Sequence, residues 1–246
     1  MRGLVKRFGA VTALGGIDLS VAPGSIAGLV GPNGSGKTTA LHVIAGILTP
    51  DAGVVEVAGV RAGSLRARRA AAFVPDDPTG LDELTVAEHV ALVAALHRAG
   101  AGADRRAAAL RDAFCLGPRW HTRLGTLSRG LRRQAALVAA LALDTPLVLV
   151  DEATATLDPE AVVVLREAIA ARALRGAAVL LATQDLGFAD AVCDEVVFLA
   201  RGRSVGAGRP EELRAAHDAV SLESALLAAT GDADLEERVR RELAAL

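Results

Sequence analysis

One nine-residue segment limits, more than any other, what this chain can fold into. The residues GPNGSGKTT match the spacing G-x-x-x-x-G-K-[ST]. A short apolar run at residues 26–30 precedes them, and helical periodicity begins at Lys37. Glycines at such a junction let backbone N–H groups at a helix N-terminus converge on phosphate oxygens. The pattern therefore predicts a nucleotide phosphate site formed by Gly31, Pro32, Asn33, Gly34, Ser35, Gly36, Lys37, Thr38 and Thr39.

Two side chains of this loop and an acidic pair carry the predicted chemistry. Lys37 is expected to reach the β- and γ-phosphates, and the Thr38 hydroxyl is expected to bind Mg²⁺. The apolar run 147–150 ends in Asp151 and Glu152. Asp151 can hold Mg²⁺, and Glu152 can polarise the attacking water. An acidic pair alone is equally typical of a helix N-cap or first turn, so this interpretation depends on the phosphate loop.

Alternating strands and helices predict an α/β fold with a mostly parallel sheet covered on both faces. The expected strands are 14–21, 26–30, 54–57, 71–74, 147–150, 178–182 and 195–199. The expected helices are 86–97, 104–114, 129–143 and 159–174. These elements predict that the chain is divided into a core at 1–75 and 145–216, a helical insert at 76–144 and a helical tail at 217–246.

Bulk properties restrict the partners and the location of the chain. The hydrophobic fraction is 52% over 246 residues, much of it alanine, and no apolar run reaches the roughly 18 to 20 residues that cross a bilayer. The first residues lack the apolar core of a secretory signal, so a cytosolic chain is expected. Cys115 and Cys193 fit a reducing compartment and are expected to be small core residues. A net charge of −2 gives no reason to expect nucleic acid.

Three further segments resemble motifs of the nucleotide-binding cassette of ABC transporters. Residues 127–131, LSRGL, resemble the family signature usually written LSGGQ, and residues 153–159, ATATLDP, resemble the segment after the catalytic glutamate. Phe8, in KRFG, resembles the aromatic residue that stacks on adenine. With the phosphate loop and the acidic pair, these segments follow the family's order over nearly the whole chain. The resemblance implies a P-loop cassette with a parallel core, a small antiparallel β subdomain and an inserted helical subdomain.

The resemblance also implies partners and a mechanism. Two cassettes, identical or different, close head to tail, and each ATP with its Mg²⁺ lies between one phosphate loop and the other subunit's signature. Ser128 and Gly130 would contact the partner's ATP, and Asp158 would lie at the dimer contact. The dimer would drive an integral-membrane permease and so lie at the cytoplasmic face of the membrane. Residues 221–231 resemble the tail of drug- and antibiotic-exporting cassettes, although a helix packing on its own core explains them equally well.

Four departures from the family pattern bear on hydrolysis. Asp76, in FVPDD, stands where the family has a glutamine, and an ionised carboxylate can bind Mg²⁺ but cannot donate a hydrogen bond. Gln184, in ATQD, replaces the switch histidine and cannot relay a proton. Arg129 and Leu131 replace signature residues. The chain also begins close to Phe8, so the first strand of the antiparallel subdomain is expected to be largely absent.

These residues together predict a site that binds MgATP and hydrolyses it slowly. The expected catalytic groups are Lys37, Glu152 and Gln184. The expected metal ligands are Thr38, Asp151 and Asp76, and nucleotide contacts extend to Phe8, Asp76 and Gln184. The main expected function is that of an ATP-binding subunit of a transporter. Its dimer, homomeric or heteromeric, would power export by a separate membrane subunit. The alternative is a regulatory or mechanically relaying subunit with little turnover of its own.

Overall fold

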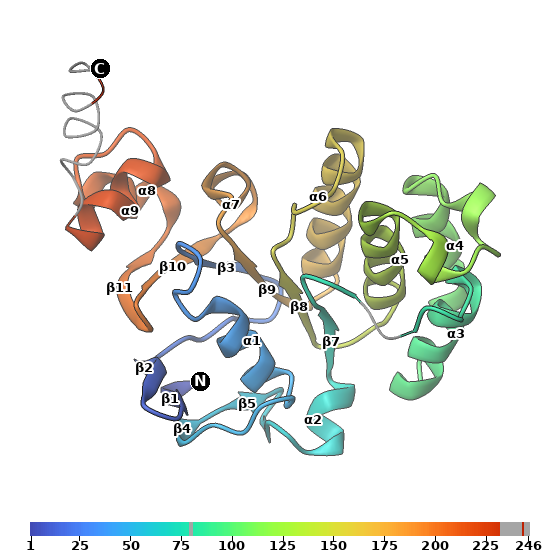
Figure 1. Ribbon diagram of the computed structural model, residues 1–246, viewed down its shortest axis with the longest axis horizontal. Helices are drawn as coiled ribbons and strands as arrows, with labels where there is room; N and C mark the ends of the chain where they lie inside the picture. The colour runs from blue at the N-terminus through green and yellow to red at the C-terminus, as the bar shows by residue number, and fades with distance from the viewer. Residues whose placement is uncertain (79–80, 232–242, 244–246) are drawn as a thin grey trace.

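A six-stranded sheet forms the centre of the computed structural model, which describes residues 1–78, 81–231 and 243 (Figure 1). Its strands are β3 (Ile26–Val30), β7 (Ala71–Val74), β8 (Leu147–Asp151), β9 (Ala178–Thr183), β10 (Glu195–Ala200) and β11 (Arg203–Gly208). They lie in the order β11-β10-β3-β9-β8-β7. All neighbours pair in parallel except β11, which is antiparallel to β10. The predicted mostly parallel sheet is confirmed.

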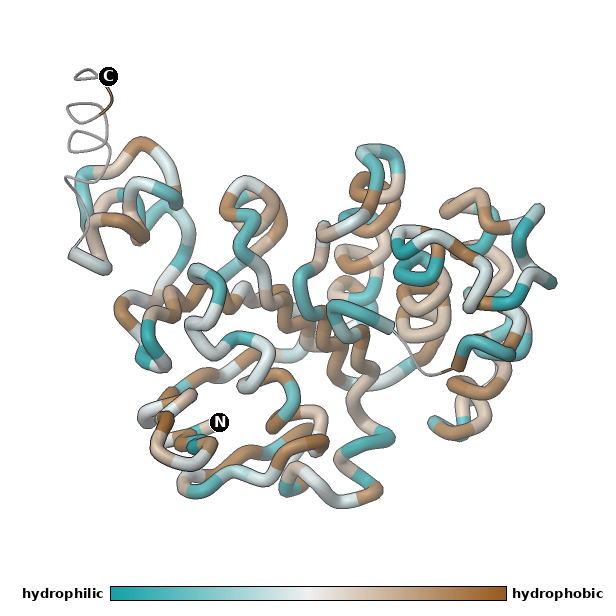
Figure 2. Tube along the Cα trace, viewed as in Figure 1, coloured by the Kyte–Doolittle hydropathy of each residue, from teal (hydrophilic) through white to brown (hydrophobic). Residues whose placement is uncertain are grey.

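Both faces of this sheet are buried along its five parallel strands, which explains why these strands are nearly continuous apolar runs. Along β8, Val148 and Val150 belong to one core cluster and Leu149 to the other. The strands accordingly form a hydrophobic band through the middle of the molecule (Figure 2). Helix α1 (Lys37–Ile44) packs on one face, and the other face is covered by α5 (Arg129–Leu141), α6 (Pro159–Leu174) and α7 (Leu186–Val192). A parallel sheet is stable in this arrangement because neither face meets water.

The beginning of the chain forms a separate antiparallel sheet. This sheet has the order β2-β1-β4 and consists of β1 (Arg2–Phe8), β2 (Val11–Ile17) and β4 (Ala52–Val54). The expectation that its first strand is largely absent is wrong, because β1 is the central strand and pairs with both neighbours. In β1 only Leu4 is buried. The strand is held by its pairing with β2 and β4, and it has no regular alternation of buried and exposed residues, so its local pattern gave no strand signal.

Short elements connect this sheet to the core. The run 54–57, expected as one strand, is divided between β4 and a hairpin of β5 (Glu56–Val57) and β6 (Val60–Arg61). The strand expected at 14–21 lies earlier in the chain, as β2. Helix α2 (Leu65–Arg69) follows the hairpin, and the Ser64 side chain caps its first turn.

A layer of helices lies beside the sheet, formed by α3 (Val86–His97), α4 (Ala103–Ala113) and α5 (Figure 1). Thr85 and Glu88 form a capping box at the start of α3. The turns Gly117–Arg119 and Leu124–Thr126 connect α4 to α5. Helix α5 contacts α3 and α4 as well as β7 and α6, so it joins the helical layer to the sheet.

The end of the described chain packs beside β11 as α8 (Pro210–Ala216) and α9 (Leu222–Thr230). Residues 232–242 and 244–246, at the end of the expected helical tail, lie outside the described residues. Cys193 is buried as expected, but Cys115 is exposed, because it occupies the turn after α4 with a φ of 54°. Within the part of the chain that the structure describes, no helix is long and apolar enough to cross a membrane.

Candidate functional site

The phosphate loop lies at the carboxyl end of β3 and leads directly into α1. Gly36 has a φ of 109°, and a Cβ there would lie 2.6 Å from the carbonyl oxygen of Ala13, so only glycine fits. The Gly202 N–H donates a 2.9 Å hydrogen bond to the Ser35 carbonyl. The loop is therefore held by β2 and by the β10–β11 turn, at a helix N-terminus suited to an anion.

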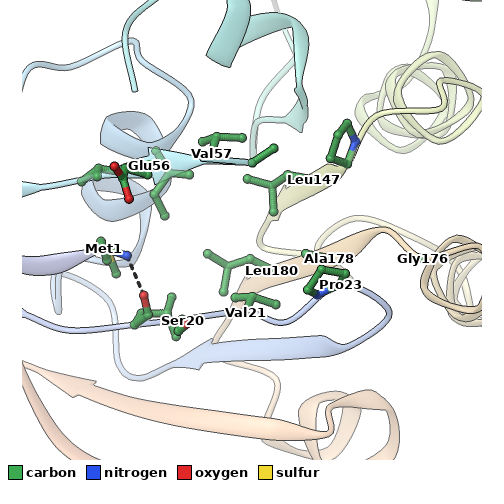
Figure 3. Close-up of a pocket in the computed structure, with 15 residues that line it drawn as sticks. Met1, Ser20, Val21, Pro23, Glu56, Val57, Leu147, Gly176, Ala178 and Leu180 are labelled. Carbon is green, nitrogen blue, oxygen red and sulfur yellow. Dashed lines mark hydrogen bonds between the residues drawn. The ribbon is translucent and has the colours of Figure 1, made fainter. Parts of the chain in front are cut away.

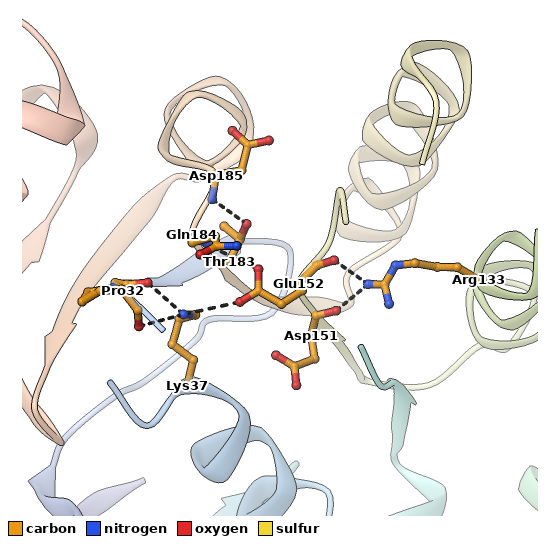
Figure 4. Close-up of polar contacts among 9 residues, drawn as sticks. Pro32, Lys37, Arg133, Asp151, Glu152, Thr183, Gln184 and Asp185 are labelled. Carbon is orange, nitrogen blue, oxygen red and sulfur yellow. Dashed lines mark hydrogen bonds and ion pairs between the residues drawn. The ribbon is translucent and has the colours of Figure 1, made fainter. Parts of the chain in front are cut away.

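Lys37 lies against this loop and is almost completely buried, with 4% of its surface exposed. Its Nζ donates hydrogen bonds of 2.8 Å and 3.2 Å to the carbonyl oxygens of Gly31 and Pro32 (Figure 4). The same nitrogen lies 3.4 Å from Oε1 of Glu152. One ammonium group thus joins the phosphate loop to the end of β8, which places the predicted phosphate contact beside the predicted base.

Glu152 follows β8 with a φ of 46°, a left-handed conformation that costs roughly 1 to 3 kcal/mol for a residue with a Cβ. Its Oε2 accepts a 3.3 Å hydrogen bond from the backbone N–H of Gln184, which follows β9. The Gln184 side chain itself is exposed. The carboxylate of Glu152 is therefore aimed by the main chain and by Lys37 into the space above the loop (Figure 4).

Asp151 is completely buried at the end of β8. Neither of its carboxylate oxygens has a hydrogen-bond partner among the described residues. Burial raises the pKa of this carboxyl, the nearby Glu152 and Asp76 charges raise it further, and the Thr38 hydroxyl opposes the rise. A buried carboxylate with open oxygens beside a hydroxyl fits a Mg²⁺ ion, which takes few protein ligands and shares phosphate and water oxygens.

No group of three His, Cys, Asp or Glu side chains converges as a metal cage within the described part of the chain. Mg²⁺ sites that depend on substrate phosphates do not need such a cage. Asp76, the third expected ligand, is directed elsewhere. Its carboxylate oxygens lie 3.2 Å and 3.4 Å from Nη2 of Arg129, with both side chains about half exposed.

The signature segment forms the start of α5. Ser128 is the N-cap, and its hydroxyl accepts a 3.3 Å hydrogen bond from the Leu131 N–H. A Cβ on Gly130 would lie 2.6 Å from the carbonyl oxygen of Thr156. The structure therefore requires glycine at 130, where a segment of the same chain approaches closely, whereas Arg129 extends to Asp76.

Two other predicted site residues lie at the ends of elements. Asp158 caps α6, and its Oδ1 accepts a 2.7 Å hydrogen bond from Ala161 N–H. Phe8 ends β1 and is 49% exposed, with Lys6 Nζ 5.5 Å from the centre of its ring. A helix cap at Asp158 and an open aromatic face at Phe8 are both compatible with contacts to a second molecule.

Sequence reasoning missed Arg133, which is completely buried beside this site. Its guanidinium donates to the main-chain carbonyls of Asp151 and Glu152 (Figure 4). Burial lowers the pKa of this guanidinium, and the charges of Asp76, Asp151 and Glu152 oppose the shift. Its spacing in the sequence could have indicated this burial, because Arg133 shares a helix face with Leu137 and Leu141, which are both buried.

A cavity of about 290 Å³ lies at the other end of the strands from this site (Figure 3). Leu147 and Ala178, the first residues of β8 and β9, contribute to its mostly apolar lining. The Met1 amine, at its edge, donates a 2.6 Å hydrogen bond to the Leu19 carbonyl. Among the described residues that line it, Glu56 has the one ionisable side chain, so no lysine or arginine side chain lies there to bind phosphate.

The fold and the site at the carboxyl ends of the strands define a P-loop nucleotide hydrolase. Lys37, at the start of the helix that follows β3, meets the end of β8, where Asp151 and Glu152 stand, at one sheet edge, which is where ligands bind in open α/β sheets.

Comparison with known proteins narrows this class. The family model described as ABC transporter matches residues 14–155. The daunorubicin/doxorubicin resistance ATP-binding protein DrrA of Streptomyces peucetius is 34% identical over 244 residues, which cover 98% of this chain and 74% of that protein. Nod factor export ATP-binding protein I of Ralstonia nicotianae is 32% identical over 216 residues, covering 87% of this chain and 67% of that protein.

Solved structures agree. An ATP-binding subunit of an ABC transporter superposes with a TM-score of 0.87 at 30% identity, covering 93% of this chain and 98% of that chain. A dimeric cassette in a post-hydrolysis state with ADP and Pi has a TM-score of 0.76 at 24% identity, covering 85% and 97%, and shares the fold. The chain belongs to the ABC transporter family, as an ATP-binding subunit with ATPase activity.

Proposed function

We propose that this chain binds MgATP in a head-to-tail dimer of cassettes and powers export through a separate integral-membrane permease, which holds it at the cytoplasmic face of the membrane. The observation that carries the proposal is the convergence of Lys37, Asp151 and Glu152 at the phosphate loop. Export is supported by relatives named for daunorubicin resistance and for Nod factor export.

The proposed chemistry assigns one task to each group. Lys37 and the loop N–H groups bind the β- and γ-phosphates. Thr38 and Asp151 would hold Mg²⁺, which would supply positive charge to offset that of the phosphates. Glu152 orients the attacking water and accepts its proton. In the dimer, Ser128 and the Gly130 N–H contact the partner's ATP, Asp158 lies at the dimer contact, and Phe8 stacks on adenine.

Co-purification of the full chain from its native cell tests the transport role. A polytopic membrane protein in stoichiometric amount is the expected result, together with ATP turnover that changes when this partner is present. Association with ribosomes or DNA in place of a membrane protein would contradict the proposal.

We also propose that the site turns ATP over slowly, because two groups differ from those of a fast site. Asp76 is engaged by Arg129, and Gln184 has no titratable group. A turnover number within the range typical of enzymes, about 1 to 10³ per second, would contradict slow hydrolysis. Turnover that stays negligible even with the membrane partner would favour the second candidate function, a regulatory or mechanically relaying subunit.

Replacing Asp76 with glutamine is expected to raise ATP turnover about threefold to tenfold, a gain of roughly 1 kcal/mol in transition-state stabilisation. The longer neutral amide can donate as well as accept hydrogen bonds, and it loses the ion pair that directs Asp76 to Arg129. Steady-state ATPase assays at saturating Mg²⁺ measure the effect, with Asp77→Asn as the matched control at the next carboxylate. A fall in turnover would mean that the Asp76 carboxylate itself serves the metal.

Gln184→His is expected to raise turnover about tenfold and to make it depend on pH near the ordinary histidine pKa of about 6.5. The backbone N–H of Gln184 bonds Glu152, so a side chain at this position starts next to the proposed base. The pH profile of turnover between about pH 5.5 and 8.5 is the measurement. A variant whose pH profile matches that of the wild type would show that this position does not face the reacting phosphate.

A further inference from the structure

Arg133 is a buried cation that binds main-chain oxygens from two neighbouring strand ends. It lies on α5 with none of its surface exposed. Nη1 donates hydrogen bonds of 2.8 Å and 2.9 Å to the carbonyls of Pro75 and Asp76. Nη2 donates to the carbonyl of Asp151 and, at 2.7 Å, to that of Glu152. The guanidinium therefore joins the segment after β7 to the end of β8.

Burying the guanidinium charge of Arg133 costs free energy unless that charge is fully compensated. Among the described residues, no carboxylate forms an ion pair with Arg133, and carbonyl dipoles alone receive its hydrogen bonds. A structural anchor for α5 would need only apolar contacts, which Leu137 and Leu141 already make from the same helix face. The planar fork instead matches two pairs of carbonyls in a fixed geometry.

The backbone units that Arg133 holds are those from which the proposed hydrolysis groups extend. Asp151 and Glu152 carry the carboxylates assigned to Mg²⁺ and to water, and Asp76 stands at the third expected position. Glu152 is also in a strained left-handed conformation, which persists only where the surroundings enforce it. The hydrogen bond from Arg133 to the Glu152 carbonyl is one such restraint.

We propose that Arg133 is a positioning residue for ATP hydrolysis: its guanidinium fixes the backbone of Asp76 relative to Asp151 and Glu152. The role rests on the hydrolysis site proposed above. Because Ser128, the residue assigned to the partner's ATP, is the N-cap of α5, Arg133 also links that contact mechanically to the chain's own site. The exposed pair of Asp76 with Arg129 adds little to this link, because solvent screens it.

Arg172 provides a matched comparison at the opposite end of β8. It lies on α6 with 1% of its surface exposed. Its guanidinium donates hydrogen bonds of 2.6 Å to the Thr145 carbonyl and 2.9 Å to Oδ1 of Asp144. Both arginines are buried and bind main chain next to β8, but only Arg133 does so beside Asp151 and Glu152.

The test compares Arg133→Met, Arg133→Lys and Arg172→Met in the full chain. We measure the thermal midpoint, the affinity for ATP without Mg²⁺, and ATP turnover as a function of Mg²⁺ concentration, at a temperature where each variant is folded. We expect Arg133→Met to bind Mg²⁺-free ATP within about threefold of wild type and to lose about 100-fold in kcat, as a misplacement of about 1 Å would cause. Its Mg²⁺ requirement is expected to rise. Arg172→Met is expected to lose thermal stability yet keep kcat within about twofold.

The Arg133→Lys variant tests the same role if Arg133→Met does not fold. One ammonium cannot bridge both carbonyl pairs in the geometry of the fork, so kcat is expected to fall about tenfold, with an increased Mg²⁺ requirement. Wild-type kcat in a folded Arg133 variant, or an equal loss in Arg172→Met, would overturn the positioning role. If Glu152→Gln retains turnover, the proposed hydrolysis site itself is wrong. If Glu152→Gln is inactive while the Arg133 variants are not, only the positioning role fails.

Discussion

The Glu152→Gln variant is expected to lose at least about 100-fold in ATP turnover while it continues to bind MgATP, since a general base typically contributes a factor of about 10² to 10⁴. Glutamine keeps the length of the side chain but cannot accept the proton of the attacking water. A neutral amide would replace the carboxylate, so the ion pair with Lys37 would be lost. Single-turnover assays with purified chain, together with equilibrium ATP binding, separate the chemical step from binding.

The control for this variant is Glu167→Gln on α6, where the side chain is exposed and pairs with Arg166. Its turnover is expected to equal that of the wild type. We also expect Glu152→Gln to accumulate as an ATP-bound dimer in size-exclusion chromatography, because ATP that is not hydrolysed continues to bridge the two cassettes. Turnover within about tenfold of wild type would show that another group activates the water.

Lys37→Met is expected to weaken ATP binding by about 100-fold or more. Two charge-assisted hydrogen bonds to phosphate, each contributing about 1.5 to 3 kcal/mol, correspond to at least that factor. The Lys37 side chain is almost completely buried, with 4% of its surface exposed. Methionine has nearly the same volume, so little repacking is expected. Titration with ATP in the absence of Mg²⁺ measures the loss, and unchanged affinity would exclude Lys37 as a phosphate ligand.

The parts of the fold that sequence could predict are those whose local pattern reflects burial on both faces. The runs 26–30 and 71–74 became β3 and β7 with the expected bounds, because a strand covered on two sides must be apolar at every position. In contrast, β1 buries only Leu4, and its place in the sheet depends on pairing with β2 and β4. Pairing with other strands cannot be read from the sequence of one strand alone.

For the candidate site too, the sequence predicted the local motifs but not the contacts between distant residues. The glycine-rich loop and the acid pair are local motifs, and the structure brings Lys37 and Glu152 within 3.4 Å. Their functional roles stay predictions. The contact between Asp76 and Arg129 joins residues 53 positions apart, and no local rule indicates it. Arg133 was missed for a related reason, because a charged residue in a basic cluster is typical of a solvated helix face.

The chain has two lysines, Lys6 and Lys37, among 27 basic residues. Lys37 is buried against the phosphate loop, and the amine of Met1 is bonded to the Leu19 carbonyl. Reagents that modify lysine amines therefore meet very few targets, and both side chains are largely buried, with 14% of Lys6 and 4% of Lys37 exposed. The rate at which an amine reagent labels Lys37, followed by mass spectrometry, can thus report on the environment of one buried ammonium group without any amino-acid substitution in the nucleotide site.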